Sequence, residues 1–148
     1  MEFQQNTATG RILALDLGRK RIGLALSDSL GISAQGLPTL QRTTIREDIA
    51  AIETIAQQNG VKLILLGHPL NMNGTEGRQA RYTTDFAERL TARTGLAVKS
   101  WDERMTSIEA GRVLRESGIS IEKRARAVDR LSAVILLESY LDYLGFQQ

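Results

Sequence analysis

Three acidic residues stand out by their chemistry and their positions. Asp16 lies inside the apolar segment RILALDL, where a carboxylate is costly unless a cation or hydrogen-bond donors satisfy it. Glu103 follows Asp102 after an apolar segment, at the strand end where α/β sheets place their ligand sites. Asp129 lies in a predicted helix with small residues one turn away. Carboxylate oxygens suit Mg²⁺ and Mn²⁺, and two such ions can clamp the attacking and leaving oxygens of a phosphoryl displacement.

Each acid also has an ordinary structural interpretation. Asp16 is close enough to a glycine to form a turn, and Asp102 is placed to cap a following helix. On the surface, Asp129 could pair with Arg126 or Arg130. The three acids therefore indicate a metal site only if the fold brings them together.

Other catalytic chemistries find few candidates. The chain has no cysteine and one histidine, His68, which removes disulfides, thiolate nucleophiles and the ligand sets of zinc enzymes. Absence of cysteine also agrees with a reducing compartment.

Basic residues form two groups, each beside one of the acids. The first group follows Asp16 and the second precedes Asp129; their members are Arg19, Lys20 and Arg21, and Lys123, Arg124 and Arg126. The net charge of +2 permits a polyanion partner without requiring one, so each group alone could be a solvated surface. Their joint placement favours phosphate contacts.

Two further segments are candidates for contact with the same substrate. Arg104 directly follows Glu103. The loop of residues 69–77, which contains Asn71, is rich in Gly, Pro and Asn, and its glycines allow close backbone approach to a phosphate. A plain strand-to-helix turn is the alternative for this loop.

The elements that position these residues follow from hydrophobic periodicity and capping signals. Strands are predicted at 11–17, 21–27, 32–40, 61–66 and 96–101, and helices at 45–59, 78–93, 106–118 and 125–144. The three residues between the first two strands predict an antiparallel hairpin. Glycines at 60, 95 and 145 are expected to end helices. Antiparallel strands thus come first and βα units later, which indicates a mixed sheet.

The chain of 148 residues fits one domain, which we assign to residues 11–148 after a flexible leader at 1–10. The leader lacks the apolar core of a secretory signal. The longest apolar run, AVILL, is far shorter than the roughly 20 residues of a membrane span. A cytoplasmic protein without membrane contact is therefore expected.

Four blocks of the sequence carry a family resemblance. They are LALDLGRKRIGLALSD (13–28), LLGHPLNMNGTEG (65–77), WDERMTS (101–107) and VDRLSAVILLESYL (128–141). With these blocks in this order, the chain resembles the YqgF family, also called RuvX, whose members carry the names Holliday junction resolvase and pre-16S rRNA nuclease. The resemblance extends over nearly the whole chain.

This resemblance implies an RNase H-like fold of the RuvC type: a mixed five-stranded sheet, its first three strands antiparallel, with helices on both faces. It also implies that Asp16, Glu103 and Asp129 share one or two Mg²⁺ or Mn²⁺ ions. The implied function is metal-dependent phosphodiester hydrolysis in processing the 5′ end of pre-16S rRNA, with nucleic acid, RNA more than DNA, and pre-ribosomal particles as partners.

Three other functions stay open at this point. The chain could be a DNA junction resolvase, which must act as a dimer on a two-fold symmetric junction, so that a monomer or weak homodimer favours RNA. It could be a non-catalytic nucleic-acid-binding factor, although the intact acid trio opposes this. The chain also begins like a nucleotide-binding half-domain of the actin and sugar-kinase type. Proteins of that type need two such domains to hold the nucleotide, and this chain has room for one.

Overall fold

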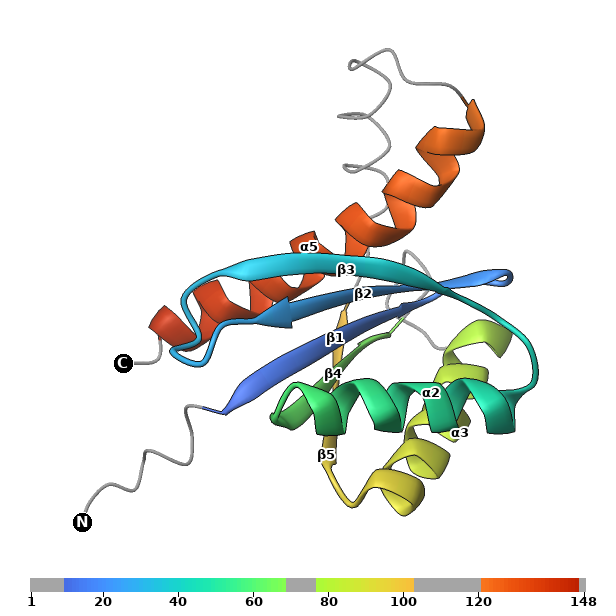
Figure 1. Ribbon diagram of the computed structural model, residues 1–148, viewed down its shortest axis with the longest axis horizontal. Coiled ribbons are helices and arrows are strands. Elements are labelled where there is room, and N and C mark those ends of the chain that lie inside the picture. Colours follow the sequence, from blue (N-terminus) through green and yellow to red (C-terminus); the bar gives the residue numbers. More distant parts are fainter. Residues whose placement is uncertain (1–9, 69–76, 103–120, 147–148) are drawn as a thin grey trace.

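The computed structural model describes residues 10–68, 77–102 and 121–146, without the side chains of residues 121–130 and 146. It contains five strands, which are β1 (Arg11–Leu17), β2 (Arg21–Ser27), β3 (Ala34–Gln41), β4 (Val61–His68) and β5 (Ala97–Asp102). Its helices within these residues are α2 (Ile45–Gln58), α3 (Arg78–Thr94) and α5 (Ile121–Phe146) (Figure 1). The helix expected at 106–118 lies outside the described residues.

All five strands form one mixed sheet in the order β3-β2-β1-β4-β5. β1 pairs antiparallel with β2, and β2 with β3. β4 pairs parallel with both β1 and β5. The sequence prediction of a mixed five-stranded sheet with three antiparallel strands first is therefore confirmed. β1 lies at the centre of the sheet, so its residues are covered on both sides.

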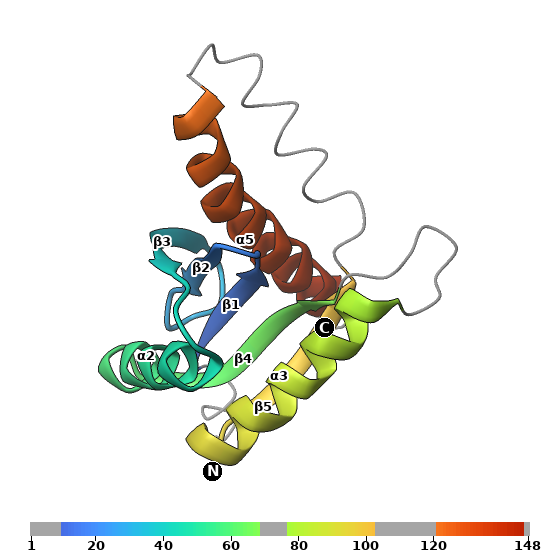
Figure 2. The same ribbon diagram turned by 90° about the vertical axis from the view of Figure 1, so that its right-hand side faces the viewer.

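Helices cover the two faces of the sheet separately (Figure 2). On one face, α2 and α3 pack onto a cluster of buried residues that includes Leu13 and Leu15 of β1. On the other face, α5 packs onto a cluster that includes Ile12 and Ala14. We call this second side the α5 face. Successive side chains of a strand point to opposite faces, which explains why neighbours in β1 belong to different clusters.

The turn between β1 and β2 is as short as the sequence predicts. The backbone N–H of Gly18 donates to the carbonyl of Arg21 over 2.9 Å. A Cβ at Gly18 would lie 2.6 Å from that carbonyl oxygen, so only glycine allows this close approach. The turn places Arg19 and Lys20 at the exposed tip of the hairpin.

Strand β3 begins two residues later than expected and contains a proline. The pairing register of β2 and β3 shifts between Ile22 and Leu24, which face Leu40 and Leu37. Pro38 lies within this irregularity on an edge strand, where its missing N–H costs no ladder hydrogen bond. The irregularity thus accommodates a proline within the strand.

Helix boundaries agree with the capping signals in α2 and α3. The Thr44 side chain accepts a hydrogen bond from the backbone N–H of Glu47 over 3.1 Å at the start of α2. Gly60 and Gly95 follow α2 and α3 with positive φ angles of 63° and 75°, a conformation that ends helices at little cost in glycine. The expectation for these two helices is confirmed to within one residue.

The last helix differs from the prediction at both ends. α5 begins at Ile121 instead of residue 125, so Lys123 and Arg124 lie within the helix. It continues to Phe146, so the prediction that Gly145 ends it is wrong. Gly145 is not among the glycines with positive φ in the described residues, and a glycine that keeps a helical backbone does not end a helix.

An aromatic cluster anchors the edge strand β5 to α5. The Trp101 ring lies 5.0 Å from the Tyr140 ring in an edge-on arrangement and 5.1 Å from the Tyr143 ring. Trp101 Nε1 donates to Ser139 Oγ over 3.1 Å. Such aromatic pairs contribute about 0.5–1.5 kcal/mol each beyond the area they bury.

None of the described helices is long and apolar enough to cross a bilayer.

Candidate metal and nucleic-acid site

Asp16 lies on the α5 face, near the C-terminal end of the central strand. It alternates with Leu15 and Leu17, which pack against the cluster on the opposite side of the sheet. Its side chain is half-buried. Asp16 alternates with Ala14, which belongs to the α5 cluster, so the Asp16 carboxylate faces the side of the sheet that α5 covers.

The strands beside Asp16 carry glycines at the neighbouring positions. Gly23 of β2 is its register partner. Leu15 pairs with Leu66 on β4, so Gly67 is the next β4 residue in that register. Two glycines leave the α5 face beside the carboxylate free of side chains from the flanking strands.

The same row of the sheet leads to the end of β5. Gly67 pairs with Trp101, and His68 with Asp102. Asp16, Gly67 and Trp101 thus lie in one row across three adjacent strands. Glu103, Arg104 and Asn71, all predicted site residues, lie outside the described residues. β5 ends at the same edge of the sheet as β1 and β4, because these three strands are parallel.

Asp129 belongs to α5, and its side chain also lies outside what is described. The buried residues that follow it are Ser132, Ala133, Leu136 and Leu137. Asp129 comes one helical turn before Ser132 and Ala133 in α5. Ser132 is 2% exposed, and its Oγ has no hydrogen-bond partner within the described part of the chain.

The predicted basic residues lie at the same end of the fold. Arg19 and Lys20 are exposed at the tip of the β1–β2 hairpin, and Arg21 is half-buried at the start of β2. The N-terminal part of α5, which carries the second basic group, rises on the side of the molecule where this hairpin ends (Figure 1). The side chains of Lys123, Arg124 and Arg126 are not described.

Arg42 is a residue that sequence reasoning missed. Its guanidinium donates to Asp48 Oδ2 over 3.1 Å and to the carbonyl oxygen of Gly18 over 3.0 Å, and it also hydrogen-bonds the Tyr82 hydroxyl. Asp48 is 2% exposed, and its other oxygen accepts from the backbone N–H of Thr43 over 3.0 Å. Arg42 therefore ties the hairpin turn to α2 and α3.

The surroundings of Arg42 keep its side chain charged. Burial acts to lower the pKa of Arg42, but hydrogen bonds to Tyr82 and Asp48 outweigh it, so this pKa lies above its usual value. The guanidinium also lies 5.5 Å from the Tyr82 ring centre, within the range of a cation–π contact. A pocket of about 310 Å³ opens here, lined by residues that include Arg19, Arg42 and Tyr82.

The described residues do not include a complete cluster of metal ligands. Within residues 10–68, 77–102 and 121–146, apart from the side chains named above, no three His, Cys, Asp or Glu residues gather as a metal site would require. Two of the three predicted ligands, Glu103 and Asp129, have side chains outside this description. The described part thus supplies one candidate ligand, Asp16, together with the strand that ends just before Glu103 and the helix that contains Asp129.

Similarities to known structures agree with this architecture. The RuvC protein of T. thermophilus, in complex with a Holliday junction substrate, is similar with a TM-score of 0.55 and 12% identity, over 92% of this chain and 96% of that one. The fowlpox virus resolvase with Holliday junction DNA is similar with a TM-score of 0.56 and 12% identity, over 90% and 98% of the two chains. These likenesses establish an RNase H-like fold of the RuvC type.

Similarity in sequence extends over almost the full chain. A protein of Koribacter versatilis, provisionally named pre-16S rRNA nuclease, is 50% identical over 94% of this chain and 91% of its own length. A protein of Moorella thermoacetica with the same provisional name is 45% identical over 91% of this chain and 96% of its own. The family model RuvX, described as Holliday junction resolvase, matches residues 10–143. The chain therefore belongs to the RuvX family.

Proposed function

We propose that this protein is a divalent-metal-dependent nuclease that hydrolyses phosphodiester bonds during maturation of the 5′ end of pre-16S rRNA. Asp16, Glu103 and Asp129 hold Mg²⁺ or Mn²⁺ in this proposal and are its catalytic residues. The observation that carries it is the position of Asp16, a half-buried carboxylate on the central strand, facing the side that α5 covers.

The topology supports convergence of the other two acids on Asp16. Glu103 comes two residues after Trp101, and two further extended residues would return it to the α5 face. Asp129 precedes the buried stripe of α5 by one helical turn. All three would then lie at the edge of the sheet where β1, β4 and β5 end, which is where α/β sheets bind their ligands.

The donors proposed around Asp16 fit a hard cation. They are carboxylate oxygens, which Mg²⁺ and Mn²⁺ prefer. Gly23, the register partner of Asp16, adds no side chain on the α5 face, and the buried Ser132 Oγ on α5 is without a hydrogen-bond partner among the described residues. Bound divalent ions would stabilise the charge on the attacking and leaving oxygens. The chain itself would orient the phosphate through its arginines and lysines.

The substrate assignment rests on relatives. Two similar proteins carry the provisional name pre-16S rRNA nuclease, which supports RNA and pre-ribosomal particles as partners in this proposal. We expect the reaction to take place in the cytoplasm. A second candidate, cleavage of Holliday junctions in DNA, is favoured by the description of the matching family model. A resolvase must act as a dimer on a two-fold symmetric junction, whereas RNA processing permits a monomer or weak homodimer.

A side-by-side cleavage assay separates these candidates. The full chain is incubated with Mn²⁺ and either an RNA carrying the 5′ leader of 16S rRNA or a four-way DNA junction. We expect cleavage of the RNA near the mature 5′ end and little cleavage of the junction. Faster cleavage of the junction would establish the resolvase activity instead. Binding of either substrate without cleavage would point to a non-catalytic factor.

Basic residues on both sides of the acids are proposed to bind the substrate backbone. Asn71 and Arg104 would add contacts from segments next to the site.

The second basic group, in the N-terminal part of α5, can be tested by neutralising its charges. We expect Lys123→Gln, Arg124→Gln and Arg126→Gln together to weaken RNA binding irrespective of sequence. The dependence of log Kd on log salt should become shallower by about 0.7 for each lost contact with a single strand. Fluorescence anisotropy at several salt concentrations measures this slope, and a slope equal to wild type would assign the group to a solvated surface.

A further inference from the structure

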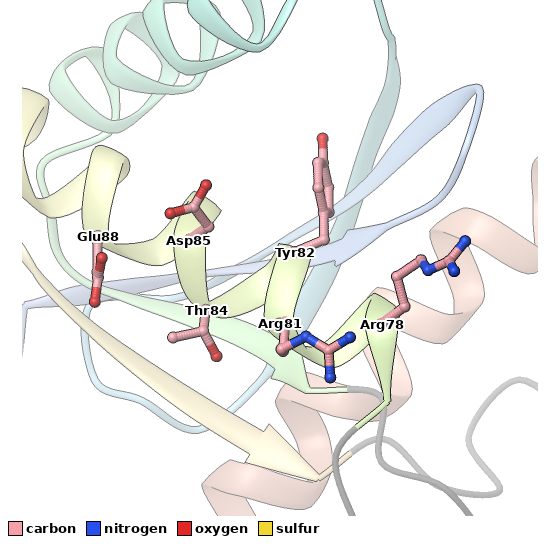
Figure 3. A pocket seen from close by; sticks show the side chains of 6 residues that line it. All are labelled: Arg78, Arg81, Tyr82, Thr84, Asp85 and Glu88. Atoms are coloured by element: carbon pink, nitrogen blue, oxygen red, sulfur yellow. The ribbon is translucent and has the colours of Figure 1, made fainter.

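Two neighbouring pockets meet at one aromatic residue, Tyr82, on the side of the sheet that α2 and α3 cover. The pocket beside Arg42 includes Arg19 at the hairpin turn and Tyr82 of α3. A second pocket of about 590 Å³ runs along α3 and is lined by Arg78, Arg81, Tyr82, Thr84, Asp85 and Glu88 (Figure 3). Tyr82 lines both pockets, so one surface continues from the turn after β1 onto the outer side of α3.

The second pocket has a basic end and an acidic end. Figure 3 shows the guanidinium groups of Arg78 and Arg81 extending toward the N-terminal end of α3, whereas Asp85 and Glu88 lie toward its C-terminal end. The first turn of α3 contains no acidic residue. A polyanion on this surface would therefore contact the basic end and be repelled from the acidic one.

The arginines on this surface differ from others nearby in their partners. Arg89 and Arg93 of the same helix form ion pairs with Asp85 and Glu53. Among the described residues, no carboxylate forms an ion pair with Arg19, Arg78 or Arg81. Basic side chains in the first turn of a helix also oppose its dipole. Helix stability therefore does not explain why arginines occupy positions 78 and 81. Binding of an external anion does explain it.

Tyr82 separates the two pockets, and its contacts hold the side chain in place. Its hydroxyl hydrogen-bonds Arg42, and its ring lies 6.3 Å from the ring of Phe86. These contacts and packing against the core cluster under α2 and α3 restrain the ring. Tyr82 is half-buried and lines both pockets. A restrained aromatic ring beside basic residues is the combination that binds single-stranded nucleic acid, because bases stack on the ring while phosphates contact the cations.

We propose that Arg19, Arg78, Arg81 and Tyr82 form a binding site for a single-stranded segment of nucleic acid that continues from the cleaved phosphodiester. The arginines contact successive phosphates, and Tyr82 stacks on an unpaired base. The three arginines and the aromatic ring together cover more surface than one phosphate group can contact. This favours a nucleic-acid strand over free phosphate as the ligand. A duplex keeps its bases stacked inside and cannot use Tyr82. This inference rests on the proposed nuclease function and specifies its substrate.

Binding of a fluorescein-labelled single-stranded RNA, measured by anisotropy without divalent metal, tests this site apart from cleavage. In the double variant Arg78→Gln/Arg81→Gln, we expect weaker binding and a slope of log Kd against log salt that is shallower by about 1.4, or 0.7 for each lost contact. The matched control is Arg46→Gln/Arg93→Gln, which removes two charges that line a different pocket. This control should keep the wild-type slope.

The aromatic contribution is tested with two substitutions. Tyr82→Leu should weaken single-strand binding about 5-fold to 150-fold, the range expected for loss of one stacked base, and should hardly affect a duplex of the same length. Tyr82→Phe keeps the ring and should bind as wild type does, which separates stacking from loss of the hydrogen bond to Arg42.

Three results would overturn the inference: a wild-type slope in the Arg78/Arg81 variant, an equal change in the Arg46/Arg93 control, or equal affinity of wild type for single strand and duplex. Failure of this inference and failure of the proposed nuclease function give different results. RNA bound through Arg78 and Arg81 but never cleaved would refute the nuclease and keep this binding site. Cleavage of RNA by an Arg78/Arg81 variant whose RNA binding is unchanged would support the nuclease function and refute this binding site.

Discussion

Replacing Asp16 by asparagine is expected to reduce RNA cleavage at least about a thousandfold, equivalent to roughly 4 kcal/mol in the barrier. The amide keeps the size of the side chain and loses the negative charge that a divalent ion requires. The fold should be retained, because Asp16 lies between residues that pack on the opposite face. Cleavage rates measured with Mn²⁺ in excess check this expectation.

Two further measurements make the Asp16 result specific. Asp142→Asn removes an exposed carboxylate from the far part of α5 and should cleave at the wild-type rate. The melting temperature of Asp16→Asn without metal should equal or exceed that of wild type, since converging carboxylates repel one another without a cation. Wild-type cleavage by Asp16→Asn would rule out a catalytic role for this residue.

Replacing Arg42 by methionine is expected to lower the free energy of unfolding by about 3–5 kcal/mol, the typical cost of leaving a buried charge without its partner. Asp48 is 2% exposed and would keep only its hydrogen bonds from Thr43. The carbonyl of Gly18 and the Tyr82 hydroxyl would lose a donor as well. Urea unfolding followed by the fluorescence of Trp101, the single tryptophan, measures the change.

The double variant Arg42→Met/Asp48→Asn serves to separate charge from packing. Removing both charges should recover part of the stability, because no unpaired charge stays buried. Arg46→Met, an exposed residue on the first turn of α2, should change stability by less than about 0.5 kcal/mol. A loss below about 1 kcal/mol in Arg42→Met would contradict a stabilising role for this network.

The strands and most helices were predictable because local signals agree with the tertiary structure. Thr44 caps α2 through the hydrogen bond that its spacing to Glu47 predicts. Glycine signals were reliable only where the backbone turns left-handed, as at Gly60 and Gly95. Gly145 has the same residue type but remains within α5. Residue type shows where a helix can end, and tertiary packing decides whether it does.

The candidate site was predictable only in part. Asp16 is conspicuous in sequence because a charge interrupts an apolar strand, and the structure places it on the face that α5 covers. Arg42 gave no such signal. Its partner Tyr82 is 40 residues away, and no periodicity or capping pattern links a residue between two elements to a distant helix. Tertiary contacts of this kind emerge only once the sheet has brought the turn after β1 next to α2 and α3.

The central claim, that cleavage depends on a divalent ion held by Asp16, Glu103 and Asp129, is tested most directly by metal removal and return. The full chain is treated with a chelator, dialysed, and assayed on RNA carrying the 5′ leader of 16S rRNA across a Mn²⁺ titration. We expect no cleavage without metal, saturable recovery with Mn²⁺ or Mg²⁺, and no recovery in Asp129→Asn at concentrations that saturate wild type. Cleavage at the full rate in excess chelator, or unaltered recovery in Asp129→Asn, would contradict the claim.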